Sequence, residues 1–327
     1  MKLRIVIVAV LGAALALYLV MFVGVGAVLS AAVAIGWSGF AILCVYALGL
    51  FLLLGLAWHV LLPGPSGADV GVFVRARMVR DAATEVLPFS QLGGIVLGAR
   101  AAILNGVSQP LALASTVVDV TTEMLAQIAF IALGLLILSV HAPRTSYSVS
   151  LTTAVAVGLV LAVIAGGVLI ALQSRGQWMT GKLARRLLRG AGTATAALAV
   201  AFDSIYRSPV RVGLSASLHL AAWIASAIGT WIAFRLIGVR VDLVSVIAIE
   251  SLIGAARSAA VFIPNALGVQ EAAYAVVAPL FGVGAEFGLA VSLLKRARDI
   301  AVGVPILLIW QAAEGRRALE VHARNCE

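Results

Sequence analysis

The chain contains little charge. Asp, Glu, Lys and Arg make up 11% of its 327 residues, whereas a soluble domain carries roughly 25%. Hydrophobic residues make up 62%, and the mean hydropathy is +1.11. This balance excludes an ordinary soluble domain. It predicts an all-α integral membrane protein with a single membrane domain, since helices satisfy their own backbone groups in lipid.

Cysteine is almost absent. Cys44 in an apolar segment and Cys326 in the polar tail are the only two, and they form neither a CxxC motif nor a disulfide framework. The four histidines are scattered: His59, His141, His219 and His322. We therefore expect no metal site and no cofactor. An isolated histidine in an apolar segment, such as His219, is expected to be a hydrogen-bonded packing residue.

Enzyme motifs are also missing. The chain has no P-loop, no GxSxG, no HExxH and no zinc-ligand spacing, so we expect no enzyme activity. The net charge of +9 would suit nucleic acid. In a membrane protein, however, basic residues chiefly set topology, and we expect no nucleic acid partner.

Long apolar runs predict about six membrane spans. They cover residues 1–28, 37–62, 110–140, 149–173, 212–236 and 287–310. The first run is longer than the roughly 7 to 15 residues of a signal-peptide core, so it is interpreted as a retained span. Most basic residues, Arg75, Arg77 and Arg80 among them, fall on the side of the N-terminus. This asymmetry predicts that both termini are cytoplasmic.

A basic segment, residues 175–211, connects the fourth and fifth spans. Its Lys and Arg side chains suit the membrane surface, where each contributes about 1 kcal/mol with anionic lipid. A solvated cytoplasmic loop explains the same composition equally well, and both interpretations stay open. The predicted organisation is a first repeat (37–140), a connecting span with the basic segment (141–211), a second repeat (212–312) and a cytoplasmic tail (313–327).

Two further apolar stretches are broken. Residues 70–107 divide around Pro88, Gly93 and Gly94, and the stretch that starts at Asp242 divides between Pro264 and Gly268. A break in an apolar helix frees backbone groups that need protein or water partners. We therefore expect two re-entrant helical hairpins, each entering and leaving on one side of the membrane.

Ionisable residues occur inside these apolar segments, where they are costly and normally face a bundle interior or a wet cavity. Asp119 and Glu123 share one helical face. The others that we place at a central polar site are Arg100, Glu250, Arg257, Asn265, Gln270, Glu271, Lys295, Arg296, Arg298 and Asp299. Some of the acids Asp81, Glu85, Asp119 and Glu123 are expected to pair with Arg257, Lys295, Arg296 or Arg298.

For several of these residues two roles stay open. Glu271 either caps the helix after the second break or contacts a ligand. Arg296 and Arg298 either hold an anionic headgroup in a bidentate fork or pair with carboxylates in the bundle. Lys295 and Asp299, one helical turn apart, can pair with each other.

The two broken regions overlay when the chain is shifted by 176 residues. Pro88 then falls on Pro264, Gly106 on Gly282 and Asp119 on Lys295. The same shift places Asp81 on Arg257. Three spans separate the two prolines, and an odd number inverts the second copy. The sequence thus predicts an inverted repeat of the kind that many transporters use.

The string from Ile263-Pro264 to Gly268-Val269-Gln270-Glu271, with a charged turn about 24 residues later, resembles the lysylphosphatidylglycerol-synthase transmembrane family. Leu87-Pro88 to Gly93-Gly94 resembles the proline-glycine motif of that family's first half. The fuller string ALGVQEAAY, with SLLKRARD and Trp310 to Glu314, is most similar to the hopanoid-biosynthesis-associated (HpnL-type) branch. The second motif holds one glycine, Gly268, where the broader family often has two.

The resemblance implies a lipid flippase in a bacterial cytoplasmic (inner) membrane, with a hopanoid or an anionic phospholipid as cargo. Lipid-biosynthesis enzymes would be further partners. No aminoacyltransferase domain follows the last span in this sequence, so lysyl transfer itself is not expected. Two alternatives stay open: a non-transporting scaffold for lipid-biosynthesis enzymes, and an enzyme acting on lipid headgroups.

Overall fold

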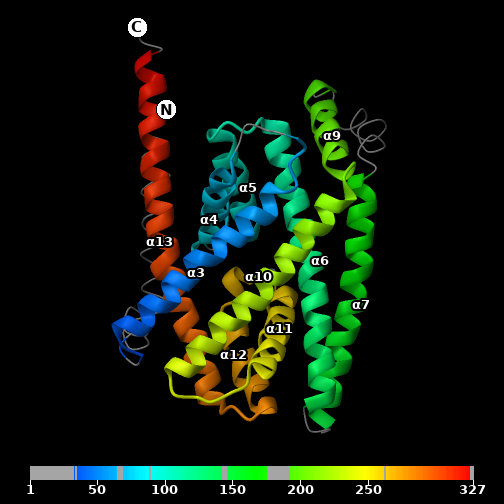
Figure 1. The fold of residues 1–327 in the computed structure, drawn as a ribbon, viewed down its shortest axis with the longest axis vertical. Coiled ribbons are helices and arrows are strands. Elements are labelled where there is room, and N and C mark those ends of the chain that lie inside the picture. Colours follow the sequence, from blue (N-terminus) through cyan, green and yellow to red (C-terminus); the bar gives the residue numbers. More distant parts are fainter. Residues whose placement is uncertain are drawn as a thin grey trace.

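The computed structural model (Figure 1) describes residues 33, 35–64, 69–87, 90–141, 146–174, 192–260 and 263–324. Within these ranges all regular structure is helical and no strand occurs. The predicted all-α membrane fold is therefore confirmed. The predicted first span, Pro88 and residues 175–191 of the basic segment lie outside the described ranges.

The described helices have the following bounds. In chain order they are α3 (Gly36–His59), α4 (Val70–Val86), α5 (Ser90–Leu104), α6 (Gln109–His141), α7 (Ser146–Ser174), α9 (Gly192–Tyr206), α10 (Pro209–Leu236), α11 (Leu243–Ala259), η1 (Pro264–Ala266), α12 (Val269–Val277), η2 (Ala278–Phe281) and α13 (Ala285–Arg324).

Four of the described helices are long and apolar enough to cross a membrane: α3, α6, α7 and α10. They match the second to fifth predicted spans. The sixth predicted span lies within α13, a single 40-residue helix. At 1.5 Å per residue this helix is about 60 Å long, twice the thickness of a bilayer's hydrocarbon core. Figure 1 shows its C-terminal part projecting beyond the other helices.

Helices α3 and α10 lie side by side and antiparallel across the body (Figure 1). A Cβ on Gly39 would lie 3.3 Å from Leu236, while the Tyr46 hydroxyl donates to the carbonyl of Ala225 at 2.7 Å. These contacts join the start of α3 to the end of α10 and the middle of α3 to the middle of α10.

We call α3–α6 the first half and α10–α13 the second half. Each half begins with a long helix, continues with a 17-residue helix and a break, and ends with another long helix. The helices before the two breaks, α4 and α11, both have 17 residues. Asp69 caps α4 by accepting from the Val72 amide, and Asp242 caps α11 by accepting from the Ser245 amide.

The turn after each break recurs as well. Gly106 and Gly282 both have positive φ, of 96° and 75°. The next amide in each turn, that of Val107 or Val283, donates to a carbonyl five residues back. Glycine adopts this left-handed conformation without the strain of a side chain.

These landmarks correct the predicted overlay. The turns are related by 176 residues, as predicted, but the helix starts Val70 and Leu243 are related by 173. The stretch between the end of the helix before the break and the glycine of the turn is therefore three residues longer in the second half than in the first. Asp81 consequently corresponds to Gly254, rather than to Arg257, and Arg77 corresponds to Glu250.

The halves also pack reciprocally: α4 packs on α13, and α11 packs on α6. Gln127 of α6 donates to the Gly254 carbonyl of α11, and a Cβ on Gly303 of α13 would lie 2.8 Å from Val86 of α4. A two-fold relation between the halves produces such reciprocal contacts. It supports the inverted repeat, which stays a prediction here.

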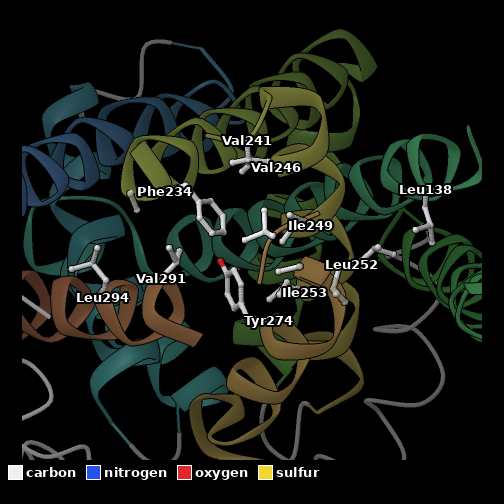
Figure 2. Close-up of a cluster of buried hydrophobic side chains, with 14 of the residues drawn as sticks. Leu138, Phe234, Val241, Val246, Ile249, Leu252, Ile253, Tyr274, Val291 and Leu294 are labelled. Carbon is white, nitrogen blue, oxygen red and sulfur yellow. The ribbon is translucent and has the colours of Figure 1, made fainter. Parts of the chain in front are cut away.

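Each half contributes most of the residues of one of two hydrophobic cores. The first-half core includes Trp58, Phe73 and Ala102. The second-half core is drawn in Figure 2 and includes Phe234, Ile249 and Tyr274. The Tyr274 ring lies among aliphatic side chains in this view, with its hydroxyl oxygen as the polar atom of the group.

Substituting Gly55 tests the close approach of α3 and α4. An added Cβ would lie 2.6 Å from the Val74 Cα, closer than two carbons can approach. We expect Gly55→Ala to lower the free energy of unfolding by about 1–3 kcal/mol, as overpacking does. The measurement is the thermal unfolding midpoint in detergent.

Gly49 of the same helix is the matched control, because an added Cβ there meets nothing within 4 Å. Gly49→Ala should leave the midpoint unchanged or raise it, since alanine favours a helix over glycine by up to about 1 kcal/mol. Equal effects of the two substitutions would contradict the packing of α3 on α4.

Candidate functional site

The two breaks in the helices meet at one junction. Glu85, in the last turn of α4, accepts from Arg257, in the last turn of α11, at 2.8 Å. Asn265 of the second break donates to the Glu85 carbonyl at 2.7 Å. The Glu85–Arg257 pair confirms the expectation that acids of the first broken region pair with bases of the second.

The backbone of the second break is strained. Asn265 and Ala266 have φ values of 48° and 45°, in the left-handed region that costs an L-residue about 1–2 kcal/mol. Gly268 has φ 80° and precedes α12. Strained backbone of this kind persists only where the surrounding structure holds it, and it clusters at functional sites.

Arg296 of α13 holds the strained segment. Its side chain is 5% exposed and forms a two-point contact with Glu271. The guanidinium also donates to the Asn265 and Ala266 carbonyls at 3.3 and 3.4 Å. In turn Glu271 accepts from the Gly268 amide at 2.8 Å, so the predicted capping role of Glu271 is confirmed.

Two further ion pairs lie on α13. The Lys295 ammonium lies 2.6 Å from Glu250 of α11, and both side chains are buried. The Tyr274 hydroxyl donates to the same carboxylate, and Lys295 donates to that hydroxyl at 2.9 Å. Arg298 pairs with its neighbour Asp299 at 2.7 Å, so Lys295 and Asp299 do not pair with each other.

A separate charged cluster, called the first-half cluster below, lies between α4 and α6 of the first half and includes one residue of α10. Asp119 is fully buried and accepts from Arg77 at 3.0 Å, Arg80 at 2.5 Å and His219 at 2.9 Å. Glu123 accepts from both arginines at 2.6 Å. The prediction that His219 is a hydrogen-bonded packing residue is confirmed.

Arg77 also donates to Asp81 at 2.8 Å. Arg77 and Arg80 are both buried, with 2% and 7% of their surface exposed, respectively. From the sequence we counted Arg77 and Arg80 among the basic residues that set topology on the side of the N-terminus, and we did not place them at the polar site. In the structure two carboxylates from α6 offset the cost of burying these guanidiniums.

In most of these ion pairs the acidic side chain is more exposed than its basic partner. The carboxylates of Asp81, Glu123, Glu271 and Asp299 have 19–24% exposed side chains, while their basic partners have 3–12%. Glu85 and Arg257 are accessible on both sides of the pair, at 26% and 30%. At the junction, therefore, both the cation and the anion of one ion pair are partly exposed.

The structure brings most of the predicted site residues of the second half together, places Asp119 and Glu123 in the separate cluster with Arg77 and Arg80, and leaves Arg100 and Gln270 outside both groups. Arg100 has a 54% exposed side chain and pairs with Glu314 in the C-terminal part of α13. Gln270 is buried and donates to Ser292 at 3.0 Å, which joins α12 to α13. The prediction that Gly93 and Gly94 break the helix is wrong, because both lie inside α5. Gly94 instead lets α5 approach α4, since an added Cβ there would meet Thr84.

Three contributors were missed as site residues: Arg77, Arg80 and Tyr274. A signal for the arginines existed, because Arg77 and Arg80 share a helical face just as Asp119 and Glu123 do. No group of three or more His, Cys, Asp or Glu side chains within the described ranges is arranged to hold a metal ion.

Comparison with protein families gives one match. The family described as the lysylphosphatidylglycerol synthase TM region matches residues 3–306, which covers almost the whole chain. The searches of curated proteins and of solved structures found no match.

Asp119→Asn tests the first-half cluster. The change would leave Arg77 and Arg80 buried with one fewer carboxylate. Breaking a buried pair by neutralising one partner costs about 3–5 kcal/mol, so we expect a large fall in the thermal unfolding midpoint. Glu314→Gln, at the exposed Arg100 pair, is the control and should change stability by less than about 1 kcal/mol.

Gly268→Ala tests the backbone of the second break. An added Cβ at Gly268 meets nothing within 4 Å, so any loss reports conformation alone. With φ at 80° we expect a loss of about 1–2 kcal/mol. Gly213→Ala in α10, where the space is also open and φ is negative, should not destabilise the protein. No difference in unfolding midpoint between the two would contradict this backbone geometry.

Proposed function

The chain belongs to the lysylphosphatidylglycerol synthase TM family, and from that premise we propose that it moves a polar-headed lipid between the two leaflets of its membrane. Membership and the apolar helices make it a multi-pass membrane protein that acts on lipids. Translocation, cargo and route are the proposed parts.

The observation that carries the proposal is the junction of the two breaks. Glu85, Arg257 and Asn265 place charged and amide groups, together with a strained backbone, between helices of an otherwise apolar body. A lipid headgroup that crosses a bilayer needs polar partners along its route, because the hydrocarbon core offers none. Charged groups at membrane depth commonly mark such routes.

The exposed groups suggest how a headgroup would bind. Arg257 is the most accessible cation of the network, so a phosphate or carboxylate of the cargo would replace Glu85 on it. Arg298 would be a second contact. Arg296 already donates to Glu271 and two backbone carbonyls, which favours a role in holding the second break over direct binding.

The membrane arrangement follows from the same proposal. The pairs α4–α5 and α11–α12 would be re-entrant hairpins that enter from opposite sides, with both termini cytoplasmic. The acyl or polycyclic part of the lipid would remain in the bilayer while its headgroup passes the junction. A hopanoid or an anionic phospholipid is the proposed cargo, and a bacterial inner membrane the proposed location.

We propose transport in preference to enzyme chemistry because each candidate base, Glu271 and Glu123, is already held by an arginine, with no nucleophile among those partners. A scaffold for lipid-biosynthesis enzymes is the other function that the sequence left open. It differs in a measurable way, because a scaffold needs no polar route through its interior.

Lipid flipping in proteoliposomes tests the proposal. Headgroup-labelled hopanoid and phosphatidylglycerol would be assayed in parallel, for the wild type and for Glu85→Gln and Arg257→Gln. We expect the wild type to flip at least one lipid. Arg257→Gln should slow flipping by about tenfold or more, equivalent to roughly 1.4 kcal/mol in the barrier, because the headgroup loses its cationic partner. Glu85→Gln should also change the rate, because it removes the carboxylate that the headgroup displaces.

Arg100→Gln is the matched control, since it neutralises an arginine that is paired but peripheral, and it should flip lipid like the wild type. Gel filtration would establish that each variant is folded. Wild-type protein that flips neither lipid would favour the scaffold, and equal flipping by all four proteins would remove the junction from the route.

A further inference from the structure

In each half a deeply buried ion pair links the helix before the break to the long helix after it. In the first half Arg77 of α4 pairs with Asp119 of α6 at 3.0 Å. In the second half Glu250 of α11 pairs with Lys295 of α13 at 2.6 Å. All four residues are at most 8% exposed.

The positions of the two pairs are equivalent by independent landmarks. Arg77 follows the helix cap Asp69 by eight residues, and Glu250 follows the helix cap Asp242 by eight. On the other side of the break, Asp119 and Lys295 both lie 13 residues after the glycine of the turn, Gly106 or Gly282. The caps and turns thus assign the same two positions in each half.

The signs of charge at these positions are reversed. The first half has the cation before the break and the anion after it, whereas the second half has the anion before and the cation after. Each carboxylate has further donors, Arg80 and His219 on Asp119 and Tyr274 on Glu250. These additional hydrogen bonds satisfy the buried oxygens, as a buried pair requires.

The reversed signs distinguish the observed arrangement from one in which α4 and α11 exchange their ion-pair partners on α6 and α13. Helix α4 packs closely on α13, and α11 on α6, so each helix before a break touches the long helix of the other half and is joined to its own long helix by the ion pair. With reversed signs, an exchanged arrangement would oppose Arg77 to Lys295 and Glu250 to Asp119. Like charges buried together are strongly unfavourable, and this repulsion is a means of specificity.

We propose that Arg77–Asp119 and Glu250–Lys295 are the same positioning pair in two duplicated halves. Each pair links the helix before a break to the long helix of its own half through a buried side-chain contact, and so fixes where the ends of α4 and α11 meet. The opposite polarity of the two pairs rejects exchange of α4 and α11. Within each half the two residues must have opposite charges, but either position can carry the positive one.

Swapping the charges of the second pair tests this inference without relying on lipid transport. The variants are Glu250→Lys, Lys295→Glu and the double swap of both. Each single change places like charges together and should lower the unfolding midpoint by on the order of 5 °C or more. The double swap should recover more than half of that loss. A double swap that unfolds no higher than the less stable single variant would overturn the positioning pair.

The same swap at the exposed pair, Arg100→Glu with Glu314→Arg, is the control, and its single changes should shift the midpoint little. The double swap at Glu250 and Lys295 also gives both halves one polarity. We therefore expect a smaller fraction of its membrane-extracted protein to be monodisperse in gel filtration than for the wild type. An unchanged fraction would overturn the role of polarity in rejecting exchange.

Discussion

The cost of placing an unpaired charge in an apolar interior determines how these helices meet. Asp119 lies at the centre of the first half with no exposed surface, and Arg77, Arg80 and His219 all point to it from two other helices. Removing water from such groups costs several kcal/mol each unless partners replace it. Hydrophobic packing brings helices together with little directional preference in lipid, so the ion pairs supply much of the specificity of α4, α6, α11 and α13.

The same constraint explains the asymmetry of the two breaks. The stretch from the helix before the break to the turn glycine is three residues longer in the second half, and it contains the left-handed residues Asn265 and Ala266. Their carbonyls would be unsatisfied in an apolar interior, and Arg296 donates to both. The added length also brings the Asn265 side chain to the Glu85 carbonyl at the end of α4. A residue of the second half thereby satisfies a backbone carbonyl of the first half.

A fully paired interior has a consequence for the proposed transport. A headgroup can bind Arg257 only by displacing Glu85 or by sharing the guanidinium with it, so binding would exchange one ion pair for another. Such exchange shifts an equilibrium between states by the difference in affinity for them. The partly exposed carboxylates would then accept cationic groups of the cargo, while the buried pairs of α4 with α6 and of α11 with α13 keep the framework unchanged.

The sequence by itself determined the membrane class, the helices α3, α6, α7 and α10, the two breaks and the family, because hydropathy, Pro and Gly act over short ranges of chain. It also indicated that acids and bases of the two broken regions pair, which Glu85 and Arg257 confirm. Only the tertiary structure decided that Arg77 and Arg80 are buried, that Arg100 is peripheral, and that Lys295 pairs with Glu250, 45 residues away, in preference to Asp299. The reason is physical: local composition measures the cost of burying a charge, whereas the compensating partner lies on another helix and is known only once the helices are packed.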